Sequence, residues 1–286
     1  MNIVVQGLGE MGASLAMVLN QQHDNRVIGV DAKAVTRQAA LKNNIVSEVT
    51  DDIVAVAGQA DVIVLATPVS IIKQTMKILS KILLKSHVIV TDTGSTKNEI
   101  MAIANSELQH VAFIGGHAMA GTHKSGVAYA DDLLYVGTPY FLMPNPIGKQ
   151  RVNQLKKILA PIQAHFTAMD VTTHDDLMAM ISDVPHIAAF ALMNAAVKQL
   201  GPSEGFGQYV AGGFKDTTRI AESDPNLWTD ILLSNKASVM ANNQALIAEL
   251  EAFNQALISD DVANLTALIH AAQTSRQRLL GRENND

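Results

Sequence analysis

The stretch IVVQGLGEMG, residues 3–12, decides how the first half of this chain folds. An apolar, β-branched run leads into Gly7, Gly9 and Gly12, which have the spacing G-x-G-x-x-G. This spacing between a strand and a helix is typical of a dinucleotide-binding βα unit. Gly7 permits the tight turn, Gly9 lets a pyrophosphate approach the backbone, and Gly12 lets the helix pack on the strand. Free N–H groups at the start of the helix would face the phosphates.

A carboxylate follows at the end of the second predicted strand. Asp31 lies 19 residues after Gly12, where an acidic residue accepts hydrogen bonds from the adenosine ribose and repels a 2′-phosphate. We therefore expect NAD rather than NADP as the cofactor, although Lys33 and Arg37 are near enough in sequence to soften the repulsion. A glycine-rich turn without a ligand is the alternative for GLGEMG alone, and it does not account for Asp31.

Further β-branched runs alternate with helical stretches through the first half of the chain. Strands that are apolar on both faces are typical of a buried parallel sheet, and the repeated βα order predicts an α/β Rossmann-type doubly wound sheet. Strand candidates at 140–143 and 165–168, on either side of a helical run at 147–159, would extend it. The other expected strands are 3–5, 27–30, 62–65, 88–90 and 113–114, and the other expected helices are 10–22, 33–43 and 71–84.

Two segments that follow predicted strands carry small hydroxylated residues, ATPV at 66–69 and DTGSTK at 92–97. Ligands bind at the carboxyl ends of the strands in such sheets, and these side chains suit a nicotinamide ribose or carboxamide. The same residues also suit ordinary turns and helix N-caps. The predicted cofactor contacts are Gly7, Leu8, Gly9, Glu10, Met11, Gly12, Asp31, Thr67, Pro68, Val69, Thr93 and Gly94.

From about residue 170 onward the β-branched clusters stop, and Ala, Leu, Met and Gln recur at helical periodicity. We predict an NAD-binding domain at 1–168 and an all-α domain at 169–286. Helices with many small apolar positions are expected to bury one face against a second copy of the chain, which predicts a homodimer; a self-contained helical cap is the alternative. The expected helices are 177–200, 203–221, 225–252 and 259–280.

Composition excludes several classes of protein. The chain has 286 residues, of which 48% are hydrophobic, and it has no cysteine, so disulfides, thiolate metal sites and a cysteine nucleophile are all excluded. A formal net charge of -6 argues against a nucleic-acid partner. The opening MNIVVQG leaves no room for a secretion signal, and no run of 18 apolar residues is present. We expect a cytoplasmic protein that spans no membrane and holds no metal.

The segment GGHAMAGTHKSG, residues 115–126, places two histidines, a lysine and hydroxyls at the edge where ligands are expected. His117 could accept a proton from a substrate hydroxyl, because the usual pKa of histidine leaves it neutral and basic near neutral pH. Lys124 could hold a carboxylate. For His123, a solvated loop histidine is an equal alternative.

The helical half contributes further polar candidates. Arg219 offers a planar fork that matches a carboxylate, and Asp216 could brace it from the same helix face. His174, Asp175 and Asp176 look like a metal cluster only superficially. Their crowded spacing favours a helix N-terminus with favourable acidic charge.

Four motifs, in order along nearly the whole chain, resemble those of prephenate dehydrogenases. GGHAMAGTHKSG is similar to that family's GGHPMAG followed by KSG, and FKDTTRIAESDPNLW to its FKDxTRIAxSDPxMW. DTGSTK resembles the family's DxGSxK turn, and HDDLMAMISDVPH its HDxxxAxxSHLPH helix. The resemblance implies NAD-dependent oxidative decarboxylation of prephenate to 4-hydroxyphenylpyruvate in tyrosine biosynthesis, by an enzyme that dimerises through its helical domain.

The same resemblance implies roles for individual residues. His117 would polarise or deprotonate the ring hydroxyl of the substrate, with Ser95 hydrogen-bonded to His117 or to that hydroxyl. Arg219 would bind a substrate carboxylate. The remaining implied substrate contacts are Thr122, His123, Lys124, His186 and Trp228, the last of these from either the same subunit or its partner.

Two positions depart from the family pattern. Ala118 replaces the usual proline, which removes a restriction on the backbone of His117. Asp183 stands where histidine is frequent, and a carboxylate in the pocket would disfavour the oxo-acid side chain of prephenate and favour the ammonium of arogenate. The KSG segment favours prephenate. The sequence also ends without the regulatory ACT domain or the chorismate mutase domain that some relatives carry, so control by tyrosine through such a domain is not expected.

Two rival functions follow from the same residues. GLGEMG also suits β-hydroxyacid dehydrogenases, but ALMNAAVKQLG lacks the glycine-rich spacing around their catalytic lysine. An NAD-binding redox sensor without enzymatic activity is the other rival, and it would not need His117, Ser95 and Arg219 together.

Overall fold

The computed structural model describes residues 1–122, 124 and 126–281, and the first half of these residues forms one eight-stranded sheet. The strands are β1 (Asn2–Gln6), β2 (Arg26–Val30), β3 (Glu48–Thr50), β4 (Val62–Leu65), β5 (Ile89–Asp92), β6 (Ala112–Ala118), β7 (Pro139–Pro144) and β8 (His165–Ala168). Their order is β3-β2-β1-β4-β5-β6-β7-β8, and only the β6–β7 pair is antiparallel. Because β1 lies between β2 and β4, the chain changes direction there, which opens the crevice where doubly wound sheets bind ligands.

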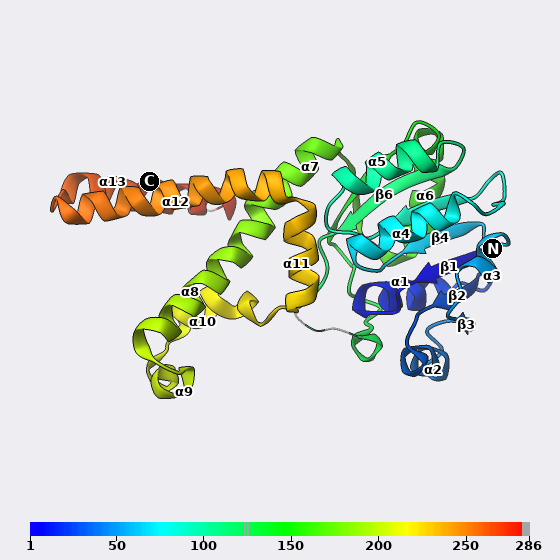
Figure 1. Ribbon diagram of the computed structural model, residues 1–286, viewed down its shortest axis with the longest axis horizontal. Helices are drawn as coiled ribbons and strands as arrows, with labels where there is room; N and C mark the ends of the chain where they lie inside the picture. The colour runs from blue at the N-terminus through cyan, green and yellow to red at the C-terminus, as the bar shows by residue number, and fades with distance from the viewer. Residues whose placement is uncertain (123, 125, 282–286) are drawn as a thin grey trace.

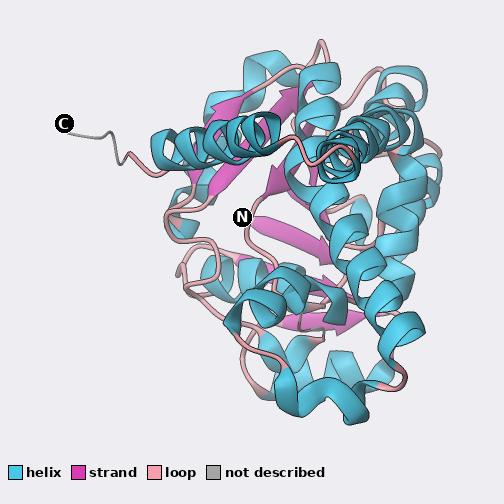
Figure 2. Ribbon diagram, turned by 90° about the vertical axis from the view of Figure 1, so that its left-hand side faces the viewer, coloured by secondary structure: helices cyan, strands magenta, loops and turns pink. Residues whose placement is uncertain are grey.

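Helices cover both faces of this sheet (Figure 2). Side chains alternate along β1, so that Ile3 and Val5 pack with Leu15 in one core and Val4 packs with Met76 in the other. The predicted α/β fold class and the extension of the sheet at both late strands are confirmed. The helices of this half are α1 (Glu10–Asn20), α2 (Ala34–Lys42), α3 (Val54–Ala57), α4 (Val69–Leu79), α5 (Asn98–Glu107) and α6 (Val152–Leu159), with short 3-10 turns η1 (Val127–Tyr129), η2 (Gly148–Arg151) and η3 (Ala160–Ile162).

The described part of the second half is entirely helical, as predicted. The chain passes from β8 to the first of these helices over residues 169–170, and the Asp170 side chain accepts a hydrogen bond from the backbone N–H of Thr173, 2.9 Å away. The elements are α7 (Val171–Met178), η4 (Ala179–Asp183, a π-helical turn), α8 (Val184–Leu200), α9 (Ser203–Phe206), η5 (Gly207–Tyr209), α10 (Gly212–Thr218), η6 (Arg219–Glu222), α11 (Pro225–Ser234), α12 (Lys236–Ile258) and α13 (Val262–Leu279).

These helices form two arms that extend away from the sheet (Figure 1). One arm contains α8, α9 and α10, and the other is the hairpin of α12 and α13, while α11 packs against α4 of the first half. The continuous run Val171–Leu200 is long and apolar enough to cross a membrane by length and composition, and few of its residues are buried within the chain. Its apolar surface is therefore available to another protein surface.

Two of the predicted helices are divided. The helix expected at 225–252 breaks at Asn235, whose side-chain amide donates to the carbonyl of Asp175, 2.8 Å away, and to Asp183 Oδ2, 3.2 Å away. These bonds hold the connection between α11 and α12 against α7. The helix expected at 203–221 is a series of short turns because four of its residues are glycine, which has low helix propensity.

Candidate active site

The glycine turn between β1 and α1 has the geometry that a dinucleotide requires. Gly7 has a φ of +90°, and a Cβ atom there would lie 2.4 Å from the Ala66 carbonyl oxygen. A Cβ on Gly12 would lie 1.9 Å from the Gly7 oxygen, whereas one on Gly9 would have nothing within 4 Å. Gly9 is also the N-cap of α1, with no side chain bonded to the free N–H groups. The turn is thus closed by Gly7 and Gly12 and open at Gly9, where a phosphate would approach.

Asp31 lies at the end of β2 beside this turn. Its Oδ2 accepts from the N–H of Leu8, 3.0 Å away, and its Oδ1 from the N–H of Lys33, 2.8 Å away. Arg37 is held elsewhere, because its guanidinium donates to the Asp31 carbonyl at 2.7 Å and pairs with Asp51 at 3.1 Å. The Arg37 charge is therefore engaged by backbone oxygens and Asp51, which leaves the Asp31 carboxylate to repel a 2′-phosphate.

Two buried polar atoms beside the glycine turn have no hydrogen-bond partner among the described residues. They are Oε1 of Gln6, at the end of β1, and Oγ1 of Thr67, just after β4. β1 and β4 are the neighbouring strands at which the chain changes direction. Because buried polar groups are normally paired, these atoms and the open Gly9 fit a polar ligand laid across the carboxyl ends of the strands.

The loop after β6 lies over the start of α1. The backbone N–H of Thr122 donates to Glu10 Oε2 at 2.9 Å and its hydroxyl donates to Glu10 Oε1 at 2.5 Å. A Cβ on Gly121 would lie 3.6 Å from the sulfur of Met11. Lys124 Nζ lies 5.2 Å from the centroid of the Tyr129 ring, within cation–π range. His123 lies outside the described residues.

His117 projects from β6 into a buried polar chain. Its Nδ1 lies 2.8 Å from His174 Nε2, and His174 Nδ1 lies 2.7 Å from Asp175 Oδ1. The other ring nitrogen of His117, Nε2, has no hydrogen-bond partner among the described residues. Burial holds the pKa of His117 well below the usual range for histidine, and the nearby charges of His174 and Lys97 lower it further. His117 is thus a neutral base at neutral pH.

A buried ion pair supports the strand that carries His117. The Lys97 ammonium pairs with Asp92 Oδ2, and both side chains are fully buried. Asp92 Oδ1 accepts from the N–H of Gly116, 3.1 Å away, and a Cβ on Gly116 would lie 2.4 Å from the Asp92 carbonyl oxygen. Burial lowers the pKa of Lys97, and the Asp92 charge partly opposes this. Asp92 therefore fixes the end of β5 to β6 next to His117.

Ser95 lies half-buried in the connection between β5 and α5. It forms no hydrogen bond with His117, whose Nδ1 faces His174 instead. Ser95 lies at the ligand-binding edge of the sheet. The other predicted partner of its hydroxyl, a substrate hydroxyl, therefore stays a prediction. The adjacent Thr96 hydroxyl lies 2.8 Å from the hydroxyl of Ser234 in α11, which joins this edge to the helical half.

The helical half brings three predicted substrate contacts together. The rings of His186 and Trp228 stack within one chain, with centroids 3.4 Å apart and an interplanar angle of 22°. His186 Nδ1 lies 2.8 Å from the carbonyl oxygen of Ser182. Burial lowers the pKa of His186, and the positive charge of Arg219 lowers it further, which places Arg219 near this ring. Asp216, expected to brace Arg219, forms no ion pair with it in the described part of the chain.

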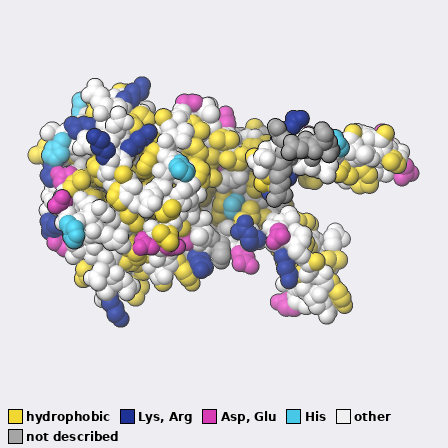
Figure 3. Space-filling model, turned by 180° about the vertical axis from the view of Figure 1, so that it is seen from behind, with side chains coloured by type: hydrophobic (Ala, Val, Ile, Leu, Met, Phe, Trp, Pro, Cys, Tyr) yellow, Lys and Arg dark blue, Asp and Glu magenta, His cyan; other side chains and the backbone are white. Residues whose placement is uncertain are grey.

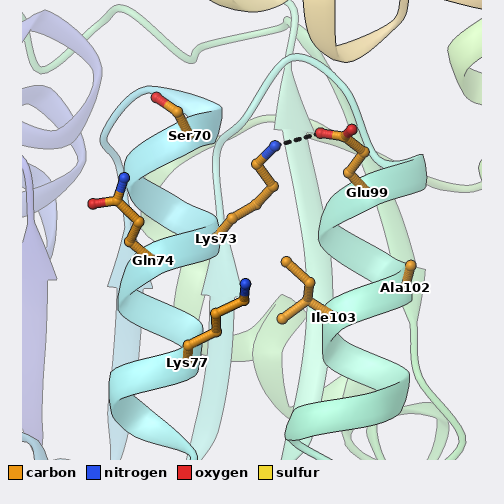
Figure 4. A pocket seen from close by; sticks show the side chains of 7 residues that line it. All are labelled: Ser70, Lys73, Gln74, Lys77, Glu99, Ala102 and Ile103. Carbon is orange, nitrogen blue, oxygen red and sulfur yellow. Dashed lines mark hydrogen bonds and ion pairs between the residues drawn. The ribbon is translucent and has the colours of Figure 1, made fainter.

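An open groove runs alongside Trp228. Its lining is mainly apolar and comes from α8, η6 and α11: Phe190, Ala221, Ser223, Pro225, Trp228, Thr229 and Leu232. A second open groove lies between α4 and α5, where Lys73 Nζ is 2.5 Å from Glu99 Oε2 (Figure 4). The second groove contains none of the predicted site residues.

Comparison with known proteins decides the family. The prephenate dehydrogenase nucleotide-binding domain matches residues 15–168, and the prephenate dehydrogenase dimerization domain matches residues 170–271. The prephenate dehydrogenase of Bacillus subtilis is 34% identical over 283 residues, which are 97% of this chain and 76% of that protein. This chain belongs to the prephenate dehydrogenase family.

Solved structures of the prephenate dehydrogenase family have the same fold. Prephenate dehydrogenase from Aquifex aeolicus, in complex with hydroxyphenyl propionate and NAD+, has a TM-score of 0.89 and 30% identity, with 98% of each chain covered. Arogenate dehydrogenase from Synechocystis has a TM-score of 0.81 and 28% identity, with 98% of this chain and 100% of that chain covered. The resemblance inferred from the four motifs is confirmed, and the β-hydroxyacid dehydrogenase alternative is removed.

Asp183, the position at which this prephenate dehydrogenase family member departs from SHLPH, does not lie on an open pocket. Its side chain is 2% exposed and is bonded to Asn235. Burial raises the pKa of Asp183 to about 6; the hydrogen bond from Asn235 lowers it, and the charge of Asp175 adds to the rise. The condition under which Asp183 would select arogenate, a carboxylate facing the substrate, is not met in this structure.

His174 and Asp175 were the site residues hardest to recognise in the sequence. Their spacing favours an acidic helix N-terminus, and they do lie in the first turns of α7, but both are fully buried; His174 is bonded to His117, and Asp175 is bonded to His174. The His-Asp pair that opens HDDLMAMISDVPH was the only indication of their position. Among the described residues, no group of three or more His, Asp or Glu residues could hold a metal.

Proposed function

We propose that this protein catalyses the NAD-dependent oxidative decarboxylation of prephenate to 4-hydroxyphenylpyruvate, a step of tyrosine biosynthesis. The observation that carries this proposal is His117, a buried neutral histidine at the carboxyl edge of the sheet whose Nε2 has no hydrogen-bond partner among the described residues. The loop that continues from it rests on Glu10 and Met11, at the start of the cofactor helix. A base is thereby placed next to a dinucleotide site, which is what removal of a hydroxyl proton together with a hydride requires.

In this proposal NAD, when bound, supplies the hydride acceptor. The Nε2 atom of His117 takes the proton of the substrate ring hydroxyl as the C–H bond at the same carbon is broken. Loss of the ring carboxylate as carbon dioxide then makes the ring aromatic. The protein contributes mainly orientation and electrostatics to this reaction.

We place the substrate between the two halves of the chain. Arg219 binds a substrate carboxylate, supported by its place beside the His186–Trp228 stack. Ser95 faces the reacting hydroxyl from the other side. The loop residues Thr122, His123 and Lys124 complete the pocket in this proposal, with Thr122 also tied to Glu10.

The proposed cofactor site follows the carboxyl ends of β1, β2, β4 and β5. Phosphates bind at the open Gly9 and the free N–H groups of α1, and the adenosine ribose binds to Asp31. The Thr67 hydroxyl, which has no partner in the described part of the chain, is available to the nicotinamide half. The remaining proposed contacts are Gly7, Leu8, Glu10, Met11, Gly12, Pro68, Val69, Thr93 and Gly94.

We further propose a homodimer formed by the helical arms, in the cytoplasm. The family's dimerization domain matches this region, and both arms expose large apolar side chains, which Figure 3 shows as patches along them. Such surfaces are typical of protein interfaces. They include Leu200, Tyr209, Met240, Leu250, Leu257, Ile258, Val262 and Leu279.

The test is NADH formation by the purified protein with NAD and either prephenate or arogenate. We expect turnover with prephenate to be faster, because Asp183 is buried away from the substrate. Faster turnover with arogenate would keep the chemistry and overturn the substrate assignment. Absence of NADH formation with both substrates would contradict the proposed function and favour an NAD-binding sensor.

A further inference from the structure

Three buried side chains connect the base of the proposed reaction to the helical half of the protein. His117 comes from β6, and His174 and Asp175 come from α7. None of the three is more than 7% exposed. The His117–His174 hydrogen bond, at 2.8 Å, crosses the boundary between the sheet and the helices, and the His174–Asp175 bond, at 2.7 Å, lies within α7.

The bonds that Asp175 accepts determine which atom donates the hydrogen in each bond of this series. Asp175 Oδ1 accepts from the backbone N–H of Lys97 at 2.8 Å, and Oδ2 accepts from the N–H of Asn98 at 2.8 Å. Backbone N–H groups can only donate, so the carboxylate acts as an acceptor toward them, and the His174 nitrogen that faces it carries the hydrogen. In a neutral ring the other nitrogen of His174 then lacks a hydrogen and accepts one from His117 Nδ1.

We propose that His174 and Asp175 are positioning residues that hold His117 in the tautomer with hydrogen on Nδ1 and a lone pair on Nε2. This inference rests on the proposed function, in which Nε2 receives the proton of the substrate hydroxyl. The proton moves from that hydroxyl to Nε2, while Nδ1 keeps its hydrogen and its bond to His174. No covalent bond to the protein is formed.

The charges around His117 are consistent with this arrangement. Lys97 and Asp92, from the β5 side, form a buried ion pair, and burial together with Lys97 keeps the ring neutral before reaction. Asp175 lies in α7 and ends the series of hydrogen bonds that begins at His117. Its carboxylate stabilises, through His174, the imidazolium that forms when His117 takes the proton. The Phe141 ring packs against both histidines, with centroid distances of 6.3 Å and 5.5 Å.

The direct test is Asp175→Asn. With its amide oxygen at the Oδ2 position, Asn can still accept from the N–H groups of both Lys97 and Asn98. The amide NH₂ then takes the Oδ1 position, faces His174 and reverses both histidine tautomers, which puts a hydrogen on His117 Nε2. A catalytic histidine in the wrong tautomer loses up to about 10⁴-fold in kcat, so we expect a loss of about 10²- to 10⁴-fold. The KM for prephenate and the Kd for NAD should change by no more than about threefold, because the change acts on the base alone.

The matched control is Asp176→Asn, the adjacent residue, whose exposed carboxylate accepts from the hydroxyl of Ser238. We expect its kcat to stay within about threefold of the wild-type value. A kcat for Asp175→Asn that matches this control would overturn the proposal. A loss that comes with equal weakening of NAD binding and a lower melting temperature would also overturn it, because that pattern indicates a structural role.

A second readout needs no turnover. Nitrogen NMR of the full-length protein labelled in histidine distinguishes ring nitrogens with and without hydrogen. We expect His117 Nε2 to lack a hydrogen in the wild-type protein and to carry one in Asp175→Asn. A hydrogen on Nε2 in the wild type overturns the proposal, whatever the substrate. Failure of the proposed function is recognised separately, as absence of wild-type turnover with prephenate.

If Asp175→Asn does not fold, substitutions of His174 give the same test. The amide oxygen of Gln in His174→Gln can accept from His117 Nδ1 and preserve its tautomer, whereas His174→Leu leaves Nδ1 without an acceptor in a similar volume. We expect His174→Gln to keep at least about tenfold more kcat than His174→Leu. Equal losses in the two variants would contradict the positioning role.

Discussion

At the scale of single residues, the site combines groups whose pKa values are set by burial. The pKa values of His117 and His186 are both below the usual range of histidine, mainly because burial removes the rings from water, and each ring is also near a positive charge. The shifts keep His117 ready to accept a proton and keep His186 uncharged beside Trp228. Arg219 is then the permanent charge in this part of the site, and it is exposed and able to reach an anionic substrate.

Arg219→Ala should mainly raise the KM for prephenate. In the proposed site its guanidinium binds a carboxylate that is present in both the substrate and the transition state, so its loss would remove uniform binding. We expect a rise of about 10- to 100-fold in KM, with kcat and the Kd for NAD much less affected. Lys198→Ala, which removes an exposed positive charge from α8, is the control. An effect confined to NAD binding would show that Arg219 is wrongly placed.

Asp183→Asn should change how stability depends on pH. The pKa of Asp183 is about 6 in the folded protein against 3.8 in the ordinary state. Because the folded-state value is raised, the stability that this carboxyl contributes is full below about pH 4 and is lost as pH rises through about 6. The variant should therefore gain stability over the wild type across this window, by up to about 3 kcal/mol.

This gain is measured as the difference in unfolding free energy between variant and wild type, by urea titration at fixed protein concentration and several pH values. In this difference, the titratable groups that both proteins share make equal contributions to the pH dependence, and these contributions cancel. Asp176→Asn, which changes an exposed carboxylate, should show no such trend. Parallel curves for Asp183→Asn and the wild type would contradict the raised pKa.

At the scale of elements, the parts of the site that follow local rules could be predicted from sequence. The glycine spacing after β1, Asp31 at the end of β2 and the loop from Gly115 to Thr122 each lie within one βα unit or one strand end. Contacts that depend on packing between halves of the chain could not be predicted. The bond from His117 to His174 joins residues 57 positions apart, and the break at Asn235 depends on its bonds to α7 and Asp183.

Gly9→Ala and Gly12→Ala should separate cofactor binding from folding in the same turn. A methyl group on Gly9 meets open space, so this variant should fold normally but bind NAD about 10-fold or more weakly, because the methyl would occupy the proposed phosphate position. A methyl on Gly12 would lie 1.9 Å from the Gly7 oxygen, so α1 must move away from β1. We expect a clear loss of melting temperature only for Gly12→Ala; equal NAD affinity in Gly9→Ala and wild type would contradict the phosphate site.

At the scale of the whole molecule, the first half is built around its own two cores, whereas the helical arms bury little within one chain. Periodicity alone predicted that these helices exist and suggested an apolar face in need of a partner. It did not predict the two-arm arrangement, which depends on the turn after α8 and the break at Asn235. The arrangement leaves room for a second copy between and along the arms (Figure 3).

In the proposed homodimer, charges introduced on α12 should separate the two subunits. Leu250 and Leu257 are 57% and 59% exposed in one chain, and burying two carboxylates in an apolar interface costs several kcal/mol. We expect Leu250→Glu with Leu257→Glu to shift the mass measured by analytical ultracentrifugation from dimer to monomer. Leu83→Glu is the control, because Leu83 is 93% exposed on the first half. A variant that remains dimeric would place the interface on another surface.

The most direct test of the account is the kinetics of His117→Asn with prephenate, alongside NAD binding by calorimetry. Asn cannot act as a base, so we expect kcat to fall by at least about 10²- to 10⁴-fold, while the Kd for NAD stays within about threefold of the wild-type value because the phosphate and ribose contacts are unchanged. A variant that turns over prephenate at the wild-type rate would contradict the account, because the proton would then leave the substrate by a route that does not involve His117.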